Sequence, residues 1–272
     1  MKADGQILRV HDLKASIVSR SQTVEAVKGV TFDIKRGESV GFVGESGCGK
    51  SVTARAIMRL APEGTRVDLG GTVQFGGRNL LTVSEAEMRD IRGRRIAMVF
   101  QDPLTSLNPV ITVGAQIEDI LRRHTGLSGH AARERVIELL AQVGIPFPAR
   151  RVDDYPHQFS GGMRQRVLIA IAISCDPDLL IADEPTTALD VTVQAQILRL
   201  LLRLREERGM SLMLITHDFG VVAGMVERVN VMYGGRIVET AGIDEIFRAP
   251  AHEYTRALLD AVPRLHRDGV SP

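Results

Sequence analysis

The most constraining feature of this 272-residue chain is an eight-residue loop, GESGCGKS, which runs from Gly44 to Ser51. The loop fits the phosphate-loop spacing G-x-x-x-x-G-K-[ST]. A short apolar run at Ser39–Val43 precedes it, and a segment of helical character at Ser51–Leu60 follows it. A phosphate loop requires that strand–loop–helix context. The sequence therefore predicts a strand and a helix that together present this loop to a phosphate group.

Each residue type in the loop suits phosphate binding for a physical reason. Glycines let backbone N–H groups close around phosphate oxygens, and the start of the following helix adds partial positive charge. Lys50 is predicted to reach the β- and γ-phosphates, and the Ser51 hydroxyl to bind magnesium. Cys48 is interpreted as a small loop filler rather than a catalytic thiol. The predicted nucleotide-binding residues here are Gly44, Ser46, Gly47, Cys48, Gly49, Lys50, Ser51 and Val52.

Two carboxylates follow a second apolar run at Leu179–Ala182. Asp183 is predicted to hold magnesium through water, and Glu184 is placed to accept a proton from an attacking water. Two adjacent acids at a strand end are only moderately specific, but the phosphate loop strengthens the interpretation. At this point the pattern fits kinases, GTPases, helicases and transport ATPases alike.

Repeated strand–helix units predict the fold class. A helical segment at 191–208 follows the acidic pair, and a further apolar run at 212–215 precedes a helical segment at 219–226. Apolar strands that alternate with helices indicate a buried parallel sheet, and therefore an α/β fold. The helix at 191–208 is predicted to face the core with one apolar stripe, made of Val193, Ile197, Leu200, Leu201 and Leu204.

Two other regions have a different pattern. Residues 7–34 alternate apolar and polar side chains, which predicts strands with one solvated face. Between residues 103 and 155 no strand pattern is found, and helical spacing occurs at 113–123 and 131–143. We therefore expect a helical insert in this part of the chain.

A second candidate anion site lies at Ser160, Gly161 and Gly162, where another helical segment begins. Such a start offers free N–H groups, an N-capping hydroxyl and no Cβ in the way. One nucleotide does not need two such sites on one chain. Two chains in head-to-tail contact need both, one for each side of the phosphate, whereas a metabolic kinase leaves the second site unexplained.

With these residues the chain resembles the nucleotide-binding subunit of an ABC transporter over nearly its whole length. Residues 159–166 resemble the signature motif of that family, and residues 188–190, which end in Asp190, resemble the D-loop. Gln101 is similar to the glutamine of the Q-loop, and His217 to the switch histidine. The motifs occur in the order that the family has.

The resemblance implies roles for these residues. Gln101 is expected to contact magnesium and water, so the implied metal site is Ser51, Gln101 and Asp183. Glu184 is expected to be the general base, and His217 to contact the γ-phosphate and position the water. The implied ligands are ATP and Mg²⁺, with Asp183, Ser160, Gly161, Gly162 and Asp190 among the nucleotide-binding residues.

The resemblance also implies the architecture. We expect one ABC nucleotide-binding domain over residues 1–272, with the α/β fold of P-loop NTPases. Its parts are a parallel-sheet core, an antiparallel β subdomain and a helical subdomain. The helical insert is expected at about 103–160, and a C-terminal element at about 250–272.

Finer matches point to the oligopeptide/dipeptide/nickel importer branch of the family. They are residues 100–109, residues 155–158, Met163, and residues 252–259 with 262–263. The branch implies two transmembrane permease subunits, a second and non-identical ATP-binding subunit, and an extracytoplasmic substrate-binding protein. The implied location is peripheral, on the cytoplasmic face of the inner membrane. Within the branch the substrate stays open between peptides, nickel chelates, opines and glycosides.

Composition excludes several other classes. The longest apolar run, Val167–Ile173, is far shorter than the roughly 20 residues that cross a bilayer, and no export leader is recognised. The net charge of +1 gives no basic footprint for nucleic acid. Two cysteines support neither a disulfide framework nor a four-ligand zinc site. The rival hypothesis is a soluble ABC-type ATPase of DNA repair or ribosomes, which usually needs a long coiled coil or tandem cassettes.

One segment departs from the family pattern. The family usually stacks an aromatic side chain on adenine from the loop before the second strand, but Ile17–Thr23 contains none. Arg20 is the residue in this segment whose guanidinium plane can stack instead, so it is our candidate for the adenine contact. The chain also lacks the cysteine-bearing tail of many branch members, so no iron–sulfur cluster is expected.

Overall fold

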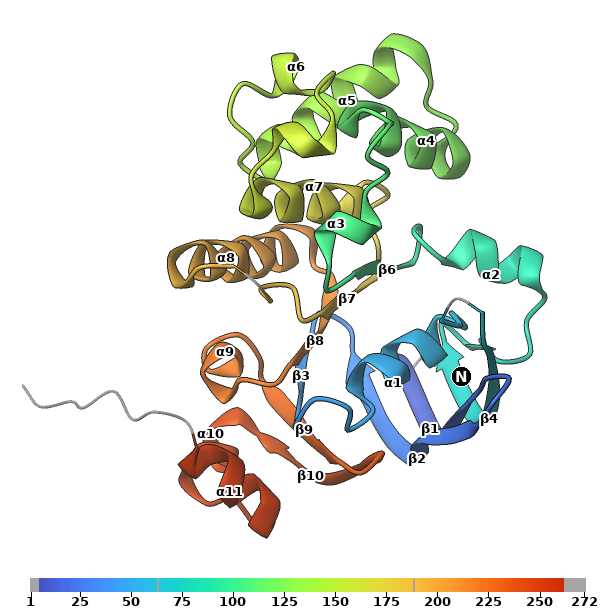
Figure 1. Cartoon of the computed structure of the whole chain (residues 1–272), viewed down its shortest axis with the longest axis vertical. Helices are drawn as coiled ribbons and strands as arrows, with labels where there is room; N and C mark the ends of the chain where they lie inside the picture. The colour runs from blue at the N-terminus through green and yellow to red at the C-terminus, as the bar shows by residue number, and fades with distance from the viewer. Residues whose placement is uncertain (1–4, 63, 188, 262–272) are drawn as a thin grey trace, which may run out of the picture.

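The computed structural model describes residues 5–62, 64–187 and 189–261, and they fold around two β-sheets (Figure 1). The strands are β1 (Gln6–Val18), β2 (Thr23–Lys35), β3 (Ser39–Val43), β4 (Arg66–Phe75), β5 (Arg78–Asn79), β6 (Ile96–Val99), β7 (Leu179–Asp183), β8 (Ser211–Thr216), β9 (Arg228–Tyr233) and β10 (Arg236–Gly242). The helices are α1 (Lys50–Ile57), α2 (Glu85–Ile91), α3 (Pro103–Ser106), α4 (Val113–Thr125), α5 (Gly129–Gln142), α6 (Pro148–Arg151), α7 (Gly161–Ile173), α8 (Val191–Arg208), α9 (Phe219–Val222), α10 (Ile243–Arg248) and α11 (Glu253–Asp260), with a 3-10 turn at Pro156–Gln158.

A six-stranded sheet in the order β10-β9-β3-β8-β7-β6 forms the centre of the core. All of its neighbouring strands pair in parallel except β10, which pairs antiparallel with β9. Every residue of β3, β7 and β8 is buried. Successive side chains point to opposite faces, so Leu180 packs toward the helices while Ile181 packs toward the second sheet. The predicted buried parallel sheet is confirmed.

The second sheet is antiparallel, in the order β2-β1-β4-β5. Along β1 the residues Leu8, Val10, Leu13 and Ala15 are fully buried, and polar residues between them are exposed. The alternation is interrupted at Asp12, where φ is +47° and the pairing register shifts. This bulge lets Leu13 face inward although it is three residues after Val10. The predicted strands with one solvated face are confirmed.

Helices α4 to α7 form the upper part of the molecule as drawn in Figure 1. The predicted helical spacings correspond to α4 and α5 within two residues at each end. Thr112 starts α4 by accepting the N–H of Ala115, and Ile117 and Leu121 on the same helix are buried. All residues from 103 to 160 are described, and none of them lies in a strand.

Two predicted helix ends are wrong. The first helix ends at Ile57 rather than Leu60, because Arg59 takes a left-handed conformation with φ of +51°. The helix expected to reach Val226 ends at Val222, where Ala223 becomes extended. That break allows Val226 to return to the sheet, where it packs beside Gly41. In both places tertiary packing outweighs local helical spacing.

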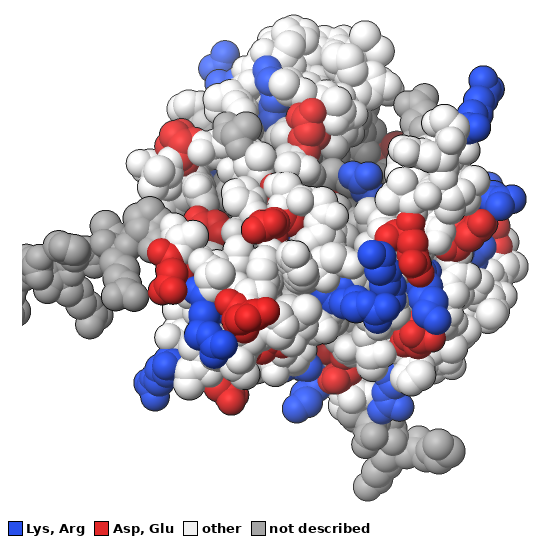
Figure 2. Space-filling view, turned by 60° about the horizontal axis from the view of Figure 1, so that its bottom comes forward, with Lys and Arg blue, Asp and Glu red and all other residues white. Residues whose placement is uncertain are grey.

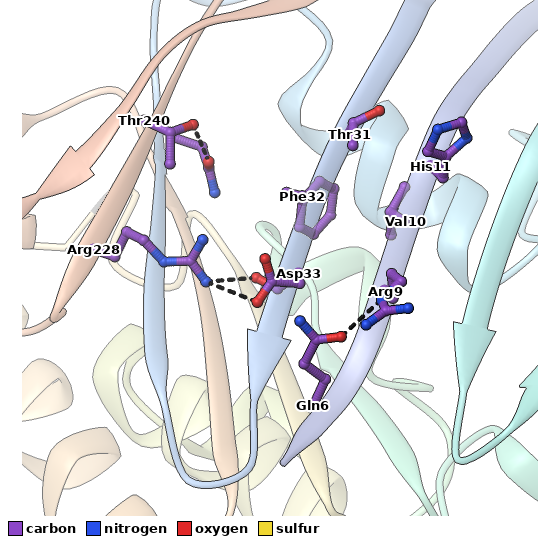
Figure 3. A pocket seen from close by; sticks show the side chains of 10 residues that line it. Gln6, Arg9, Val10, His11, Thr31, Phe32, Asp33, Arg228 and Thr240 are labelled. Atoms are coloured by element: carbon purple, nitrogen blue, oxygen red, sulfur yellow. Dashed lines mark hydrogen bonds and ion pairs between the residues drawn. The ribbon is translucent and has the colours of Figure 1, made fainter. Parts of the chain in front are cut away.

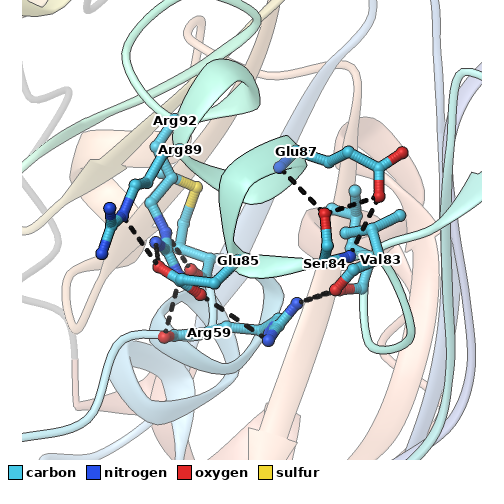
Figure 4. A network of polar contacts seen from close by, with 9 residues as sticks. Arg59, Val83, Ser84, Glu85, Glu87, Arg89 and Arg92 are labelled. Carbon is cyan, nitrogen blue, oxygen red and sulfur yellow. Dashed lines mark hydrogen bonds and ion pairs between the residues drawn. The ribbon is translucent and has the colours of Figure 1, made fainter.

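A polar network fastens α2 to the end of α1 (Figure 4). Ser84 and Glu87 form a capping box at the start of α2, each side chain bonding the backbone N–H of the other residue. Glu85 lies within ion-pair distance of both Arg59 and Arg92. The Ser-x-x-Glu spacing is a recognisable helix-start signal, and it marks a helix that our sequence analysis missed.

We predict that Leu201→Ala lowers the free energy of unfolding by about 2–5 kcal/mol, because Leu201 is fully buried on α8 and its truncation leaves a cavity. Urea denaturation measures the change. Val191→Ala on the same helix is the control, since that side chain is 82% exposed and its loss changes stability by at most about 0.5 kcal/mol. A Leu201→Ala chain as stable as the parent contradicts the packing of α8.

Candidate nucleotide site

The predicted phosphate loop connects β3 to α1 and closes tightly against two strands. Its backbone has φ of +157° at Gly44 and +107° at Gly49. A Cβ at Gly44 would collide with the carbonyl oxygen of Met232 in β9, and one at Gly49 with the carbonyl oxygen of Ala26 in β2. Glycine is therefore required at both positions, because the backbone has no room for a side chain.

Lys50 begins α1 and is almost completely buried. Its ammonium group donates to the carbonyl oxygens of Gly44 at 2.6 Å and Glu45 at 2.9 Å. A hollow of about 210 Å³ adjoins the loop, and its lining brings the loop together with two predicted catalytic residues. The lining residues are Ser46, Gly47, Gly49, Lys50, Ser51, Val52, Gln101 and Glu184.

Ser51 and Asp183 form the next part of the site. The Ser51 hydroxyl donates to Oδ1 of Asp183 at 2.7 Å. Asp183 is the last residue of β7 and is fully buried, and its Oδ2 has no hydrogen-bond partner among the described residues. Burial raises the pKa of the Asp183 carboxyl, and the Ser51 hydrogen bond partly opposes this shift. A buried carboxylate oxygen without a partner, next to a hydroxyl, is a donor set that suits a hard cation such as Mg²⁺.

Side chains from three other parts of the chain contact the Glu184 side chain. Its Oε2 accepts from Gln101 Nε2 at 3.1 Å and from Thr187 Oγ1 at 2.9 Å. His217 Nδ1 lies 3.4 Å from the same oxygen. The structure thus brings the three predicted catalytic residues together, although they are separated by up to 116 positions (217 minus 101) in the sequence. Thr187 was missed, because a threonine in a loop gives no signal of its contacts.

The backbone of Glu184 is also unusual. Its φ of +46° lies in the left-handed region, which non-glycine residues rarely adopt. The Glu184 N–H donates to the Ile215 carbonyl at 3.0 Å, and the Glu184 carbonyl accepts the N–H of Thr187 at 3.2 Å. These bonds hold the turn that follows β7 in one conformation. Such strained positions cluster at functional sites.

The second candidate anion site lies elsewhere on the chain. Ser160 and Gly161 are exposed at the start of α7, and Gly162 is half-buried. The Ser160 hydroxyl caps α7 by accepting the N–H of Met163 at 3.4 Å. None of these residues lines the hollow beside the phosphate loop.

Asp190 and Arg20 also lie outside that hollow. Asp190 caps α8, where its Oδ1 accepts the N–H of Val193 at 2.9 Å. Arg20 is exposed in the turn between β1 and β2. Ala188, which belongs to the predicted D-loop, lies outside the described residues, as do residues 262–272 of the predicted C-terminal element.

A larger hollow, of about 400 Å³, lies between β1, β2, β9 and β10 and shares no lining residue with the nucleotide hollow (Figure 3). Across it Arg228 donates to Glu38 and to the Asp33 carbonyl, which ties β9 to β2. On the face shown in Figure 2, groups of Lys and Arg side chains lie next to Asp and Glu side chains, so this face carries charges of both signs.

The comparisons with known proteins agree with this geometry. Residues 27–187 match the family described as "ABC transporter". The chain belongs to this family. Residues 238–270 match the family described as "Oligopeptide/dipeptide transporter, C-terminal region". Both predictions of family membership are confirmed, and the chain is an ATP-binding ABC ATPase.

Several named relatives are peptide transport proteins. The chain is 54% identical to the "Probable peptide ABC transporter ATP-binding protein y4tR" of Sinorhizobium fredii, over 98% of this chain and 79% of the relative. It is 51% identical to the "Dipeptide transport ATP-binding protein DppD" of Bacillus subtilis, over 97% of this chain and 79% of the relative. The rival hypothesis of DNA repair or ribosomes is not favoured by these relatives.

Solved structures confirm the fold. The dimeric ATP-binding cassette MJ0796, in a post-hydrolysis state with ADP and Pi, matches with a TM-score of 0.75 and 30% identity. The match covers 87% of this chain and 98% of the cassette. In the described part of this chain, no helix combines the length and the apolar character that a membrane span requires.

The raised pKa of Asp183 predicts a pH-dependent stability. Because the folded chain binds this proton more tightly than the unfolded chain, Asp183 contributes stability below its unfolded pKa of about 3.9. That contribution is lost as pH rises through the folded pKa. We therefore expect Asp183→Asn, free of nucleotide and metal, to be more stable than the parent at pH 7, with a difference that shrinks toward acid pH.

Urea denaturation at a series of pH values measures this difference. Asp90→Asn is the matched control, since Asp90 is exposed and loses its charge without a change in desolvation. A variant that is less stable than the parent at pH 7, or a difference that does not vary with pH, contradicts the burial cost assigned to Asp183.

Proposed function

We propose that this chain hydrolyses ATP to drive the import of peptides through separate membrane subunits. The observation that carries the proposal is the Glu184 carboxylate, which lies beside the phosphate loop and is held by Gln101 and Thr187. Support for peptides as the substrate class comes from the relatives, which are named for peptide, dipeptide and oligopeptide transport.

In this proposal the phosphate loop binds the ATP phosphates. The N–H groups of the loop and of the first turn of α1 face the phosphate oxygens, and Lys50 supplies positive charge. Ser51 and Asp183 would hold Mg²⁺, with Gln101 as a third contact. The Asp183 oxygen without a partner fits this role. Bound Mg²⁺ neutralises charge on the β- and γ-phosphates.

Glu184 accepts the proton of the attacking water. All three of its side-chain neighbours contact Oε2, so Oε1 accepts no hydrogen bond from the described residues and stays open to water. Gln101 and Thr187 thereby orient the carboxylate. His217 follows β8, and its Nδ1 lies 3.4 Å from Oε2 of Glu184. We assign His217 the contact to the γ-phosphate.

A second ATPase chain completes the site. Ser160, Gly161 and Gly162 are free to face the nucleotide of a partner chain, and Asp190 lies at the start of the neighbouring α8. The similar cassette MJ0796 is described as a dimer, which supports this arrangement. Arg20 remains our candidate for the adenine contact.

The remaining parts of the proposal concern the assembly. We assign the whole chain to one ABC nucleotide-binding domain, with a helical insert at about 103–160 and a C-terminal element at about 250–272. Its partners are two transmembrane permease subunits, a second and non-identical ATP-binding subunit, and an extracytoplasmic substrate-binding protein. The chain binds peripherally to the cytoplasmic face of the inner membrane.

The segment after Gln101 has the character of a docking surface for a membrane subunit. Three apolar side chains in it are exposed: Leu104 by 67%, Val110 by 78% and Ile111 by 40%. The segment lies between the Glu184 contact and helix α4, so a movement at the nucleotide can reach a bound partner. Apolar side chains clustered on a surface mark interaction sites.

We predict that a photo-crosslinker on Leu104→Cys or Asn108→Cys captures the membrane subunit in native membranes. Leu107 is unsuitable for the probe, because it is buried. Glu206→Cys, exposed near the end of α8, is the control and should not capture that subunit. Capture of solvent-side proteins alone from Leu104 and Asn108 argues against this docking surface.

We predict that Glu184→Gln separates ATP binding from hydrolysis. The change keeps the size of the side chain but removes the group that accepts a proton, a function typically worth about 10²–10⁴-fold in rate. ATP should stay bound with magnesium, and the two ATPase chains should stay closed around it. Phosphate release and ATP retention in the assembled transporter measure the two effects.

Lys50→Ala should behave differently, because it removes a cation next to the phosphates, and nucleotide affinity itself should collapse. A Glu184→Gln chain that hydrolyses ATP near the parental rate means that the general base is another residue, and Asp183 or His217 must then be tested. If the variant fails to retain ATP, the role of the carboxylate is structural.

A further inference from the structure

The C-terminal element returns to the phosphate loop. After β10 the chain forms α10 and α11, which lie at the lower end of the molecule in Figure 1. From α11 the Tyr254 hydroxyl accepts the backbone N–H of Glu45 at 3.0 Å. The two residues are 209 positions apart, and Glu45 is the second residue of the phosphate loop. The proposed hydrolysis mechanism gives this contact no role.

Tyr254 is held in place from two sides. Its ring contacts the ring of Tyr233, with centroids 4.5 Å apart. The Glu239 carboxylate in β10 accepts the N–H groups of Ala251 at 2.7 Å and His252 at 3.0 Å, just before α11. His252 Nδ1 then accepts the N–H of Tyr254 at 3.1 Å, which caps the helix. The hydroxyl therefore reaches the loop from a fixed support.

The loop is held at the same place by other bonds. The Glu45 carbonyl accepts from Lys50 Nζ at 2.9 Å, and the Cys48 carbonyl accepts the N–H of Gly235 at 3.0 Å. Lys50 is the residue that we expect to turn toward the phosphates when ATP binds. The Glu45 N–H that bonds to Tyr254 belongs to the Gly44–Glu45 peptide, whose carbonyl oxygen accepts from Lys50 Nζ at 2.6 Å. Tyr254 and Lys50 thus hold opposite sides of one peptide group, and the bond to Tyr254 does not use a Lys50 atom. It can therefore hold the loop while Lys50 moves.

We propose that Tyr254 is a positioning residue for the phosphate loop, and that the C-terminal element thereby sets the affinity of this subunit for ATP. The inference rests on the proposed nucleotide-binding role of residues 44–51. The hydroxyl keeps the start of the loop in the conformation that phosphate requires, so less ordering remains to be done on binding. Without it, the Glu45 N–H loses its protein partner and this end of the loop samples more conformations.

Tyr254→Phe tests the proposal, because it removes the hydroxyl and keeps the ring. Net hydrogen-bond strengths in proteins predict that Mg-ATP binds about two- to twelvefold more weakly, measured by titration of the full-length chain with a fluorescent ATP analogue. In the assembled transporter KM for ATP should rise by a similar factor while kcat stays near parental, since the Glu184 contacts are untouched. Since the hydroxyl also makes this bond without nucleotide, the midpoint of thermal unfolding should fall by no more than about 6 °C, and the variant should stay folded at the assay temperature.

Tyr233→Phe is the matched control. The Tyr233 side chain is exposed, its ring also contacts Tyr254, and its hydroxyl bonds to no described residue. This variant should bind ATP as the parent does. Equal weakening by both variants, parental affinity in Tyr254→Phe, or a loss of affinity in a Tyr254→Phe chain that is partly unfolded at the assay temperature each overturns the proposal.

Two further variants separate the possible failures. Glu239→Gln loosens the support of α11, so it should weaken ATP binding in the same direction, and its effect should not add to that of Tyr254→Phe. Additive effects contradict a shared route through Tyr254.

Lys50→Ala must abolish binding in the same assay. If Lys50→Ala still binds Mg-ATP, the proposed role of the loop is wrong. If Lys50→Ala loses Mg-ATP binding while Tyr254→Phe keeps the parental affinity, only the Tyr254 inference is wrong.

Discussion

The site depends on the register of three parallel strands. Val43 pairs with Thr216, and Asp183 pairs with Ile215, so β3, β8 and β7 end at the same edge of the sheet. The phosphate loop, the acidic pair and His217 all follow directly from these strand ends. A shift of one residue in the pairing of β7 with β8 would turn Asp183 toward the opposite face and separate it from Ser51. Burial of all three strands holds the register, because every side chain already has a packed position.

This arrangement buries two ionisable side chains at the phosphate loop, and burial of the Asp183 carboxylate costs stability. Asp183 is fully buried with one oxygen that has no partner, and Lys50 is buried against backbone carbonyls. An isolated buried charge is destabilising unless it is paired or binds a ligand. The same cost favours binding, since a cation and phosphates supply the missing opposite charges. The nucleotide-free fold is therefore less stable at this site, and nucleotide binding offsets that loss of stability.

Two further contacts reach the site from segments outside these strand ends. Gln101, three residues before the exposed Leu104, bonds to Glu184, and Tyr254 of the C-terminal element bonds to the phosphate loop. In the proposed transporter, a movement on one side of the site can reach a membrane partner, and a movement on the other side can reach the C-terminal element. In the proposed dimer the exposed Ser160 segment faces the nucleotide of a second chain, which would account for two phosphate-ready helix starts on one chain.

The sequence by itself determined the phosphate loop, the acidic pair and the buried strands, because each is a local pattern whose residues act within a few positions of one another. It also indicated Gln101 and His217, but only through resemblance, since nothing local shows that they meet at Glu184. Only the tertiary structure decided the contacts of Thr187 and Tyr254 and the early end of α9. Those features depend on which distant residue lies opposite, and strand register and packing set that relation rather than local propensity.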